Sequence, residues 1–159
     1  PEDVIEITVE LAKEMLKLSG ITDVDPRENL SNGKALEKWR EMIKAQGGDP
    51  DAALPKAEHW HVVRAKESGY VSSLEAISVG VASWRLGAGR ERKEDAVQFG
   101  AGIEIHAQVG TAVTAGDPVM TLYTETPERF ERAIVLAEEA IGISEREPAA
   151  RKLVLGRVS

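Results

Sequence analysis

The stretch from Val109 to Tyr123, VGTAVTAGDPVMTLY, is the part of the chain that decides the fold. Small residues and β-forming residues alternate along it. Gly110 and Gly116 stand where a turn needs a positive φ or the absence of a side chain. We therefore predict a tight hairpin of strand, turn and strand. Its apolar contacts come from Val109, Val113, Val119 and Leu122.

Further β structure is predicted on the N-terminal side of this hairpin. The stretch Ala65 to Val71 has the same strand, turn and strand character around Gly69. Period-2 alternation predicts a strand from His59 to Ala65, and GIEIHA predicts another from Gly102 to Ala107. The tail from Lys152 to Val158 could add a short terminal strand. Together these segments indicate one compact β-rich unit.

Helical periodicity predicts four helices, two of them before the β-rich part. The first runs from Pro1 to Leu18. The second starts at Pro26, has Asp25 as its N-cap and extends to Gln46. Gly33 lies inside this second helix, so the helix either divides there or lies close to another backbone. We favour close packing.

The two later helices flank the central hairpin in sequence. One runs from Glu75 to Leu86, is capped by Ser72 or Ser73, and has a core-facing row made of Ile77, Val81 and Trp84. The other has Thr126 as N-cap and Pro127 at its first position, and it runs to about Ala140. Its expected buried residues are Phe130, Ile134, Leu136 and Ala137.

Composition limits the classes of function. The chain has 159 residues, a net charge of −7 and no cysteine. These values suit one domain, or one domain with a helical annex. They exclude disulfides and thiolate metal sites, and they argue against a general nucleic-acid surface. No apolar run approaches the roughly 20 residues that span a bilayer, so we expect a cytoplasmic protein without a membrane partner. The chain begins with Pro1 in a helical pattern, as a piece of a longer protein would.

Two groups of residues are candidates for a chemical site. His59 and His61 share a strand face and could bind a metal ion with His106 or a carboxylate, but nothing in their spacing demands it. Gly87-Ala88-Gly89-Arg90 could wrap an anion, although it follows a helix and is better explained as a helix-ending turn. We therefore predict no catalytic, substrate-binding or metal-binding residue in this chain.

Three stretches resemble, in order and spacing, the C-terminal half of the pyrimidine nucleoside phosphorylases, the thymidine phosphorylase family. They are SNGKALEKWREMIKAQGGD at Ser31 to Asp49, KESGYVSSLEAISVGVASWRLGA at Lys66 to Ala88, and IEIHAQVGTAVTAGDPVMTL at Ile103 to Leu122. The resemblance implies a homodimeric cytoplasmic salvage enzyme. Such an enzyme cleaves thymidine or uridine with inorganic phosphate as co-substrate, without another cofactor.

The resemblance also implies a fold class, α+β, and a division of the chain. Residues 1–48 would be the last helices of a large α/β domain, and residues 57–159 a hammerhead-like C-terminal domain. Between them, residues 49–56 carry Pro50 and Pro55 and are the linker that the sequence itself indicates. The family's phosphate-binding and base-binding motifs belong to earlier segments and are absent here. The hypothesis that follows is a catalytically incomplete portion of such an enzyme, whose partner is the missing N-terminal part.

Two hypotheses of other classes stay open. Gly69-Tyr70-Val71 and the central hairpin also resemble the halves of a biotinyl or lipoyl carrier domain. Lys66 is the nearest candidate for the modified lysine, although it lacks the usual flanking residues, and an intact mass would reveal the added group. The other is an autonomous interaction module, for which the sequence offers no positive sign.

Overall fold

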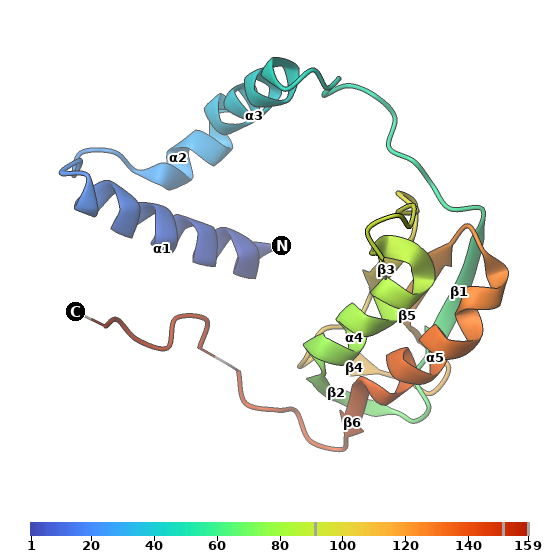
Figure 1. Cartoon of the computed structure of the whole chain (residues 1–159). Helices are drawn as coiled ribbons and strands as arrows, with labels where there is room; N and C mark the ends of the chain where they lie inside the picture. The colour runs from blue at the N-terminus through green and yellow to red at the C-terminus, as the bar shows by residue number, and fades with distance from the viewer. Residues whose placement is uncertain (91, 151, 159) are drawn as a thin grey trace. The chain divides into compact units, whose positions relative to one another are not determined.

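The computed structural model describes residues 1–90, 92–150 and 152–158 (Figure 1). The chain forms two compact units. The helical unit comprises Pro1–Ala53 together with residues 152–158, and the sheet unit comprises Leu54–Ala150. The predicted boundaries at residues 48 and 57, and the origin of the first segment in a large α/β domain, stay predictions.

The helical unit contains α1 (Glu2–Leu18), α2 (Pro26–Ser31) and α3 (Lys34–Ala45). The predicted cap of α2 is confirmed, because Asp25 Oδ1 accepts a hydrogen bond of 3.0 Å from the Arg27 amide. In the C-terminal tail, Arg157 lies 2.7 Å from a carboxylate oxygen of Glu14 on α1. No helix in the described part of the chain is long and apolar enough to cross a membrane.

The favoured interpretation of Gly33 is wrong. The helix divides there, since α2 ends at Ser31 and α3 begins at Lys34. Gly33 takes a φ of +86°, and a Cβ atom added to it would meet nothing within 4 Å. Glycine is therefore needed here because the junction between the two helices takes a left-handed backbone conformation, and not because another segment lies close.

The sheet unit contains two antiparallel sheets of three strands each. Strand β5 (Pro118–Thr124) is central in the first, between β1 (His59–Arg64) and β3 (Gly102–Ile105). Strand β2 (Gly69–Leu74) is central in the second, between β4 (Ala112–Val113) and β6 (Ile141–Ser144). The α+β class is thereby confirmed.

The prediction of a central hairpin is wrong, because its two strands do not pair with each other. The turn that was predicted between them is present. Gly116 takes a φ of +94°, and the Thr114 amide donates a hydrogen bond of 2.8 Å to the Asp117 carboxylate. The strands on either side of this turn belong to different sheets, because β4 pairs with β2 whereas β5 pairs with β1 and β3. The stretch around Gly69 behaves in the same way, since it links β1 to β2 across the two sheets.

Burial explains the place of β5. Four consecutive residues of this strand, from Val119 to Leu122, are buried, so both of its faces are covered. An isolated hairpin cannot cover both faces of a strand, so β5 needs packed layers on both sides, and its pairing with β1 and β3 makes it the central strand. Leu122 lies opposite His61 on one side and opposite Ile103 on the other.

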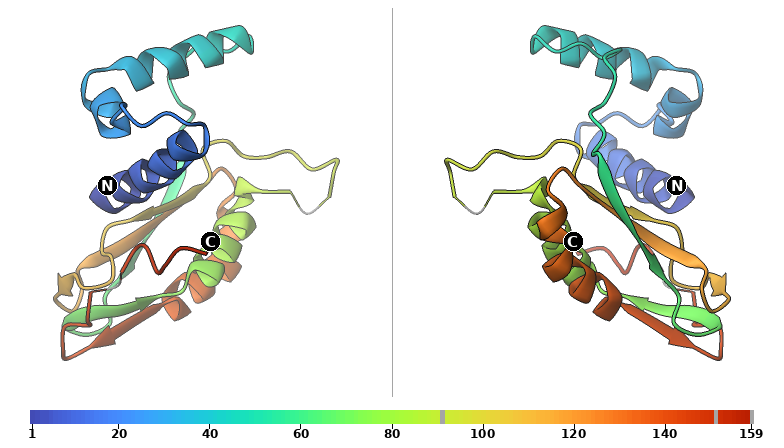
Figure 2. Two further views of the ribbon diagram at one scale, coloured as in Figure 1. Left: turned by 90° about the vertical axis from the view of Figure 1, so that its left-hand side faces the viewer. Right: turned by 90° about the vertical axis from the view of Figure 1, so that its right-hand side faces the viewer.

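Two helices lie side by side against the sheets (Figures 1 and 2). Helix α4 (Ala76–Ser83) continues into a π-helical turn, Trp84–Ala88. Helix α5 (Phe130–Glu139) follows a 3₁₀ turn, Pro127–Arg129. The core contains apolar residues of both helices and both sheets, among them Val71, Ala82, Leu86, Met120, Leu122, Ala133 and Ala137.

Several predicted helix details are wrong. Ser72 and Ser73 belong to β2, and Glu75 takes the N-cap position of α4 without a side-chain hydrogen bond. Ile77 is 75% exposed, whereas Ala82 is buried, so the buried side of α4 is not the predicted row. Thr126 and Pro127 do begin the last helical segment, but the Thr126 side chain forms no cap bond.

The end of the chain also differs from the prediction. Within the described residues, the tail from Lys152 to Val158 forms no strand. The third strand of the second sheet is β6 instead, which the sequence interpretation did not identify. Gly142 in β6 lies close to β2, since a Cβ atom added to it would come within 2.4 Å of the Ser73 hydroxyl.

Candidate functional site

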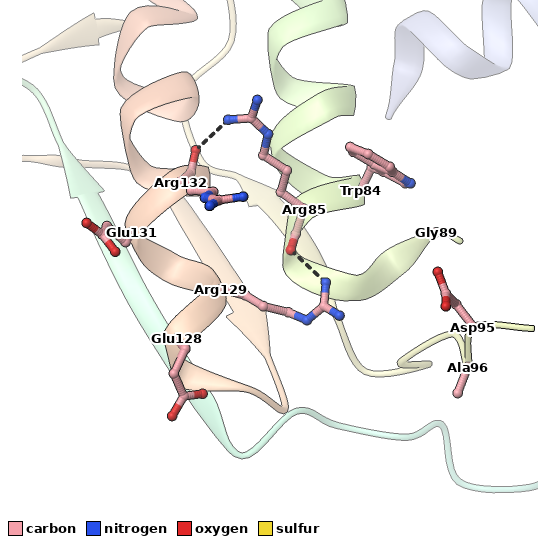
Figure 3. Close-up of a pocket in the computed structure, with 9 residues that line it drawn as sticks. All are labelled: Trp84, Arg85, Gly89, Asp95, Ala96, Glu128, Arg129, Glu131 and Arg132. Atoms are coloured by element: carbon pink, nitrogen blue, oxygen red, sulfur yellow. Dashed lines mark hydrogen bonds between the residues drawn. The ribbon is translucent and has the colours of Figure 1, made fainter. Parts of the chain in front are cut away.

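A charged cavity lies beside the end of α4 and the start of α5 (Figure 3). Its volume is about 630 Å³. Basic side chains enter it from two elements that are far apart in sequence: Arg85 from the π-helical turn, and Arg129 and Arg132 from the last helical segment. Trp84, Gly89, Asp95 and Ala96 line other parts of it.

Two of the arginines join the elements that they come from. Arg85 donates a hydrogen bond of 3.2 Å to the main-chain oxygen of Arg132, and Arg129 donates one of 3.2 Å to the main-chain oxygen of Arg85. Each of these guanidinium groups keeps further N–H donors that these bonds do not use. The guanidinium of Arg132 has no hydrogen-bond or ion-pair partner among the described residues.

The indole of Trp84 and the backbone of Gly89 form another wall. Trp84 Nε1 donates a hydrogen bond of 3.0 Å to the main-chain oxygen of Arg90. A Cβ atom added to Gly89 would lie 2.6 Å from Cδ1 of this indole, so only glycine allows the backbone to approach so closely. The indole ring is thus held in place at the start of the loop that follows the π-helical turn.

The far end of this loop is fixed by Gln98. The Gln98 amide donates a hydrogen bond of 2.9 Å to the main-chain oxygen of Gly87. The side chain of Gln98 donates to the Thr126 hydroxyl at 2.7 Å and accepts from the Glu125 amide at 2.9 Å. These bonds attach the loop to the residues that follow β5. The loop that forms this wall of the cavity is thereby fixed to the sheet unit.

Three acidic side chains also line the cavity: Asp95, Glu128 and Glu131. Figure 3 shows that the carboxylates of Glu128 and Glu131 point away from the guanidinium groups of Arg85 and Arg132. Asp95 accepts a hydrogen bond of 2.8 Å from the Arg92 amide of its own loop. In the described ranges, no ion pair joins Glu128 or Glu131 to the three arginines at 4.0 Å or less.

The histidines considered as metal ligands have separate surroundings. His61 on β1 lies against Phe130, with 6.0 Å between the ring centroids. His106 Nε2 lies 2.7 Å from the hydroxyl of Thr121. No group of three or more histidine, aspartate or glutamate residues in the described part of the chain is placed to hold a metal ion.

The other two candidate segments have ordinary structural roles. Gly87 takes a φ of +111° inside the π-helical turn, and Gly89 then leaves the helix in an extended conformation. The interpretation as a helix-ending turn is therefore confirmed. Lys66 lies in the connection between the two sheets, where its ammonium group contacts the Glu138 carboxylate at 2.9 Å. It does not lie at the tip of a paired hairpin, which is the place that a carrier lysine requires.

The sequence interpretation missed the arginines of the cavity. Arg129 and Arg132 are three positions apart, which places them on the same side of a helix, and this spacing could have been recognised. Nothing local in the sequence indicates that Arg85 joins them, because that contact depends on how α4 and α5 pack.

Comparisons with known proteins match most of the sheet unit to one family. Residues 70–144, which run from β2 to β6, match the family described as the pyrimidine nucleoside phosphorylase C-terminal domain. Residues 70–144 belong to that family. The resemblance drawn from the sequence is confirmed.

Complete relatives extend the likeness to the rest of the chain. The thymidine phosphorylase of Mycobacterium tuberculosis is 43% identical over 158 residues, which are 99% of this chain and 37% of the relative. The pyrimidine-nucleoside phosphorylase of Bacillus subtilis is 37% identical over 97% of this chain and 38% of the relative. The AMP phosphorylase of Pyrococcus furiosus is 33% identical over 86% of this chain and 27% of the relative. The chain thus spans less than two fifths of the length of these relatives.

Proposed function

We propose that this chain is the C-terminal portion of a pyrimidine nucleoside phosphorylase. The intact protein would cleave thymidine, or another pyrimidine nucleoside, with inorganic phosphate. A phosphate oxygen forms a bond to the anomeric carbon, the bond from that carbon to the base breaks, and the base leaves with the electron pair and is protonated. The observation that carries the proposal is the match of 99% of this chain to 37% of a thymidine phosphorylase.

The chain by itself would be catalytically incomplete. Phosphorolysis needs a group that aims phosphate at the anomeric carbon and donors that stabilise the charge on the leaving base. The family's motifs for both tasks are absent from this sequence. On this proposal no residue of the chain touches the reacting atoms, and the reaction needs no cofactor besides the phosphate co-substrate.

Exposed apolar side chains support the proposal that a further part of the enzyme covers this chain. Within the sheet unit, Trp60, Ile77 and Phe99 are exposed by 66%, 75% and 81%. The helical unit exposes Leu11, Met15 and Leu18 on α1. Leu11, Met15 and Leu18 are four and three positions apart, so they lie on one side of α1, and an exposed apolar stripe of this kind is typical of an interaction site. The missing N-terminal part of the same protein is the partner that we propose, in a cytoplasmic homodimer that serves nucleoside salvage.

Chromatography of the reaction mixture tests the proposal. The longer protein that contains this chain, incubated with thymidine or uridine and phosphate, should release the free base and a pentose 1-phosphate. The 159-residue chain alone should release none. Turnover by the chain alone would contradict the proposed incompleteness. A longer protein that is folded but inactive on both nucleosides would contradict the proposed activity.

A further inference from the structure

The three arginines of the charged cavity have more hydrogen-bonding capacity than the protein uses. Arg85 and Arg129 each give one bond to a main-chain oxygen, and Arg132 gives none within the described residues. The carboxylates of Glu128 and Glu131 point away from Arg85 and Arg132, and no ion pair joins them to the arginines in the described ranges. The cavity therefore contains several positively charged N–H donors that form no hydrogen bond within the described residues.

Guanidinium groups are well suited to binding phosphate groups. Their planar arrangement of donors matches the oxygens of a phosphate group, which two or three arginines can share. The start of α5 adds to the same field, since the N-terminal end of a helix carries partial positive charge. Arg129 and Arg132 lie at this end of the helix.

The size of the cavity indicates more than a free inorganic ion. A volume of about 630 Å³ falls in the range of sites for small organic molecules, which is roughly 300 to 1,000 Å³. Trp84 offers an aromatic wall within the same cavity, and its indole is fixed by the bond to Arg90. An organic group attached to the phosphate would have both space and an apolar surface.

We infer that this cavity binds a phosphate monoester of the size of a sugar phosphate or a nucleotide. Arg85, Arg129 and Arg132 would hold the phosphate group, and the organic part would lie toward Trp84. This inference does not depend on the proposed phosphorolysis, because it uses only the arginine and indole side chains of this cavity and no step of that reaction.

Nuclear magnetic resonance of the full 159-residue chain tests the inference. Trp84 is a reporter inside the cavity, while Trp39 on α3 and Trp60 on β1 are reporters outside it. Ribose 5-phosphate, uridine 5′-monophosphate and inorganic phosphate are titrated separately, at constant ionic strength set with sodium chloride. The indole signal of Trp84 should shift in a saturable manner with the monoesters, and the other two indole signals should not.

Variants identify the groups responsible. Arg132→Gln should weaken monoester binding about tenfold or more, because it removes a charge-assisted bond. This variant should fold, since the Arg132 side chain is exposed and bonds to no described residue. Arg132→Lys should retain part of the affinity. Arg146→Gln removes the same charge from the sheet unit outside the cavity, and should leave binding unchanged.

Three results would overturn the inference. The first is a Trp84 signal that does not respond to either monoester, or responds equally to sodium chloride. The second is the same affinity in the Arg132→Gln and Arg146→Gln variants. The third is binding of inorganic phosphate that is as tight as that of the monoesters, because the organic part would then have no role. Neither thymidine nor uridine is added, so these outcomes are independent of the test for phosphorolysis.

Discussion

The hydroxyl of Thr124 at the end of β5 donates a hydrogen bond of 2.7 Å to the main-chain oxygen of Leu86 in the π-helical turn. The same hydroxyl accepts a bond of 3.2 Å from the Thr126 amide, and Thr124 is completely buried. One side chain thus joins the central strand of a sheet to the turn that carries the cavity arginine Arg85. Because the position is buried, bulk water does not reach these groups.

Thr124→Val should lower the free energy of unfolding by about 1 to 3 kcal/mol, because it keeps the shape of the side chain but leaves buried polar groups unpaired. Urea unfolding followed by circular dichroism measures the change. Thr114→Val is the matched control, since Thr114 is exposed and its hydroxyl has no bond among the described residues. It should change the stability by less than about 0.5 kcal/mol. Equal effects of the two substitutions would contradict the role of Thr124.

Gly87→Ala should destabilise the protein by about 1 to 3 kcal/mol, because an L-residue is strained at positive φ. Gly87 has a φ of +111°, and a Cβ atom added to it would lie 2.8 Å from Cδ of Gln98. Gly80→Ala should instead raise the free energy of unfolding. Gly80 lies inside α4 with nothing within 4 Å of an added Cβ, so alanine should stabilise the helix by about 0.5 to 1 kcal/mol. Thermal unfolding of both variants measures this difference in sign.

Leu122→Ala should cost about 2 to 5 kcal/mol, because it leaves a cavity in the core. Leu122 is fully buried and pairs with strands on both sides of β5. Val135→Ala on the outer side of α5 is the control, since Val135 is 54% exposed. Chemical denaturation gives both values, and a loss below about 1 kcal/mol for Leu122→Ala would contradict the central place of β5 in the core.

The Tyr123 hydroxyl donates a hydrogen bond of 2.9 Å to the Glu104 carboxylate, which raises the pKa of Tyr123 above its ordinary value. The protonated tyrosine is therefore favoured in the folded state. Its contribution to stability is present below the ordinary tyrosine pKa of about 10 and is lost as the pH rises through the raised value.

Glu104→Gln should lower the pKa of Tyr123, because it removes the negative charge from the acceptor of this hydrogen bond. The protein has two tyrosines, so the Tyr70→Phe background leaves Tyr123 as the single phenol. Ultraviolet absorbance during an alkaline titration follows the phenolate directly. Glu94→Gln, a substitution in the exposed loop, is the charge-matched control. A Tyr123 pKa that is the same in the Glu104→Gln and Glu94→Gln variants would contradict this cause.

Local signals in the sequence predicted local structure well. Asp25 and Pro26 marked the start of α2, Gly116 marked a turn, and the alternation from His59 marked β1. Each of these features depends on the conformational preference of a few neighbouring residues. The family resemblance rested on ordered motifs and was also confirmed.

Arrangements that depend on distant residues were not predicted. Nothing in the stretch from Val109 to Tyr123 shows that its two strands join different sheets, because that pairing depends on β1, β2 and β3. The buried side of α4 was misplaced for the same reason, since its apolar residues surround the helix and only the packed sheets select the buried ones. The charged cavity required Arg85 and Arg132 to meet across 47 positions of sequence.

The chain passes back and forth between the two sheets, and this order of strands affects how the protein folds during synthesis. The first sheet needs β5, which comes after β4 of the second sheet, and the second sheet needs β6, which comes last. Neither sheet can therefore be completed before most of the unit has left the ribosome, and the second must wait for Ser144. Nascent chains that stop before this residue should remain sensitive to protease, and protection should arise in one late step.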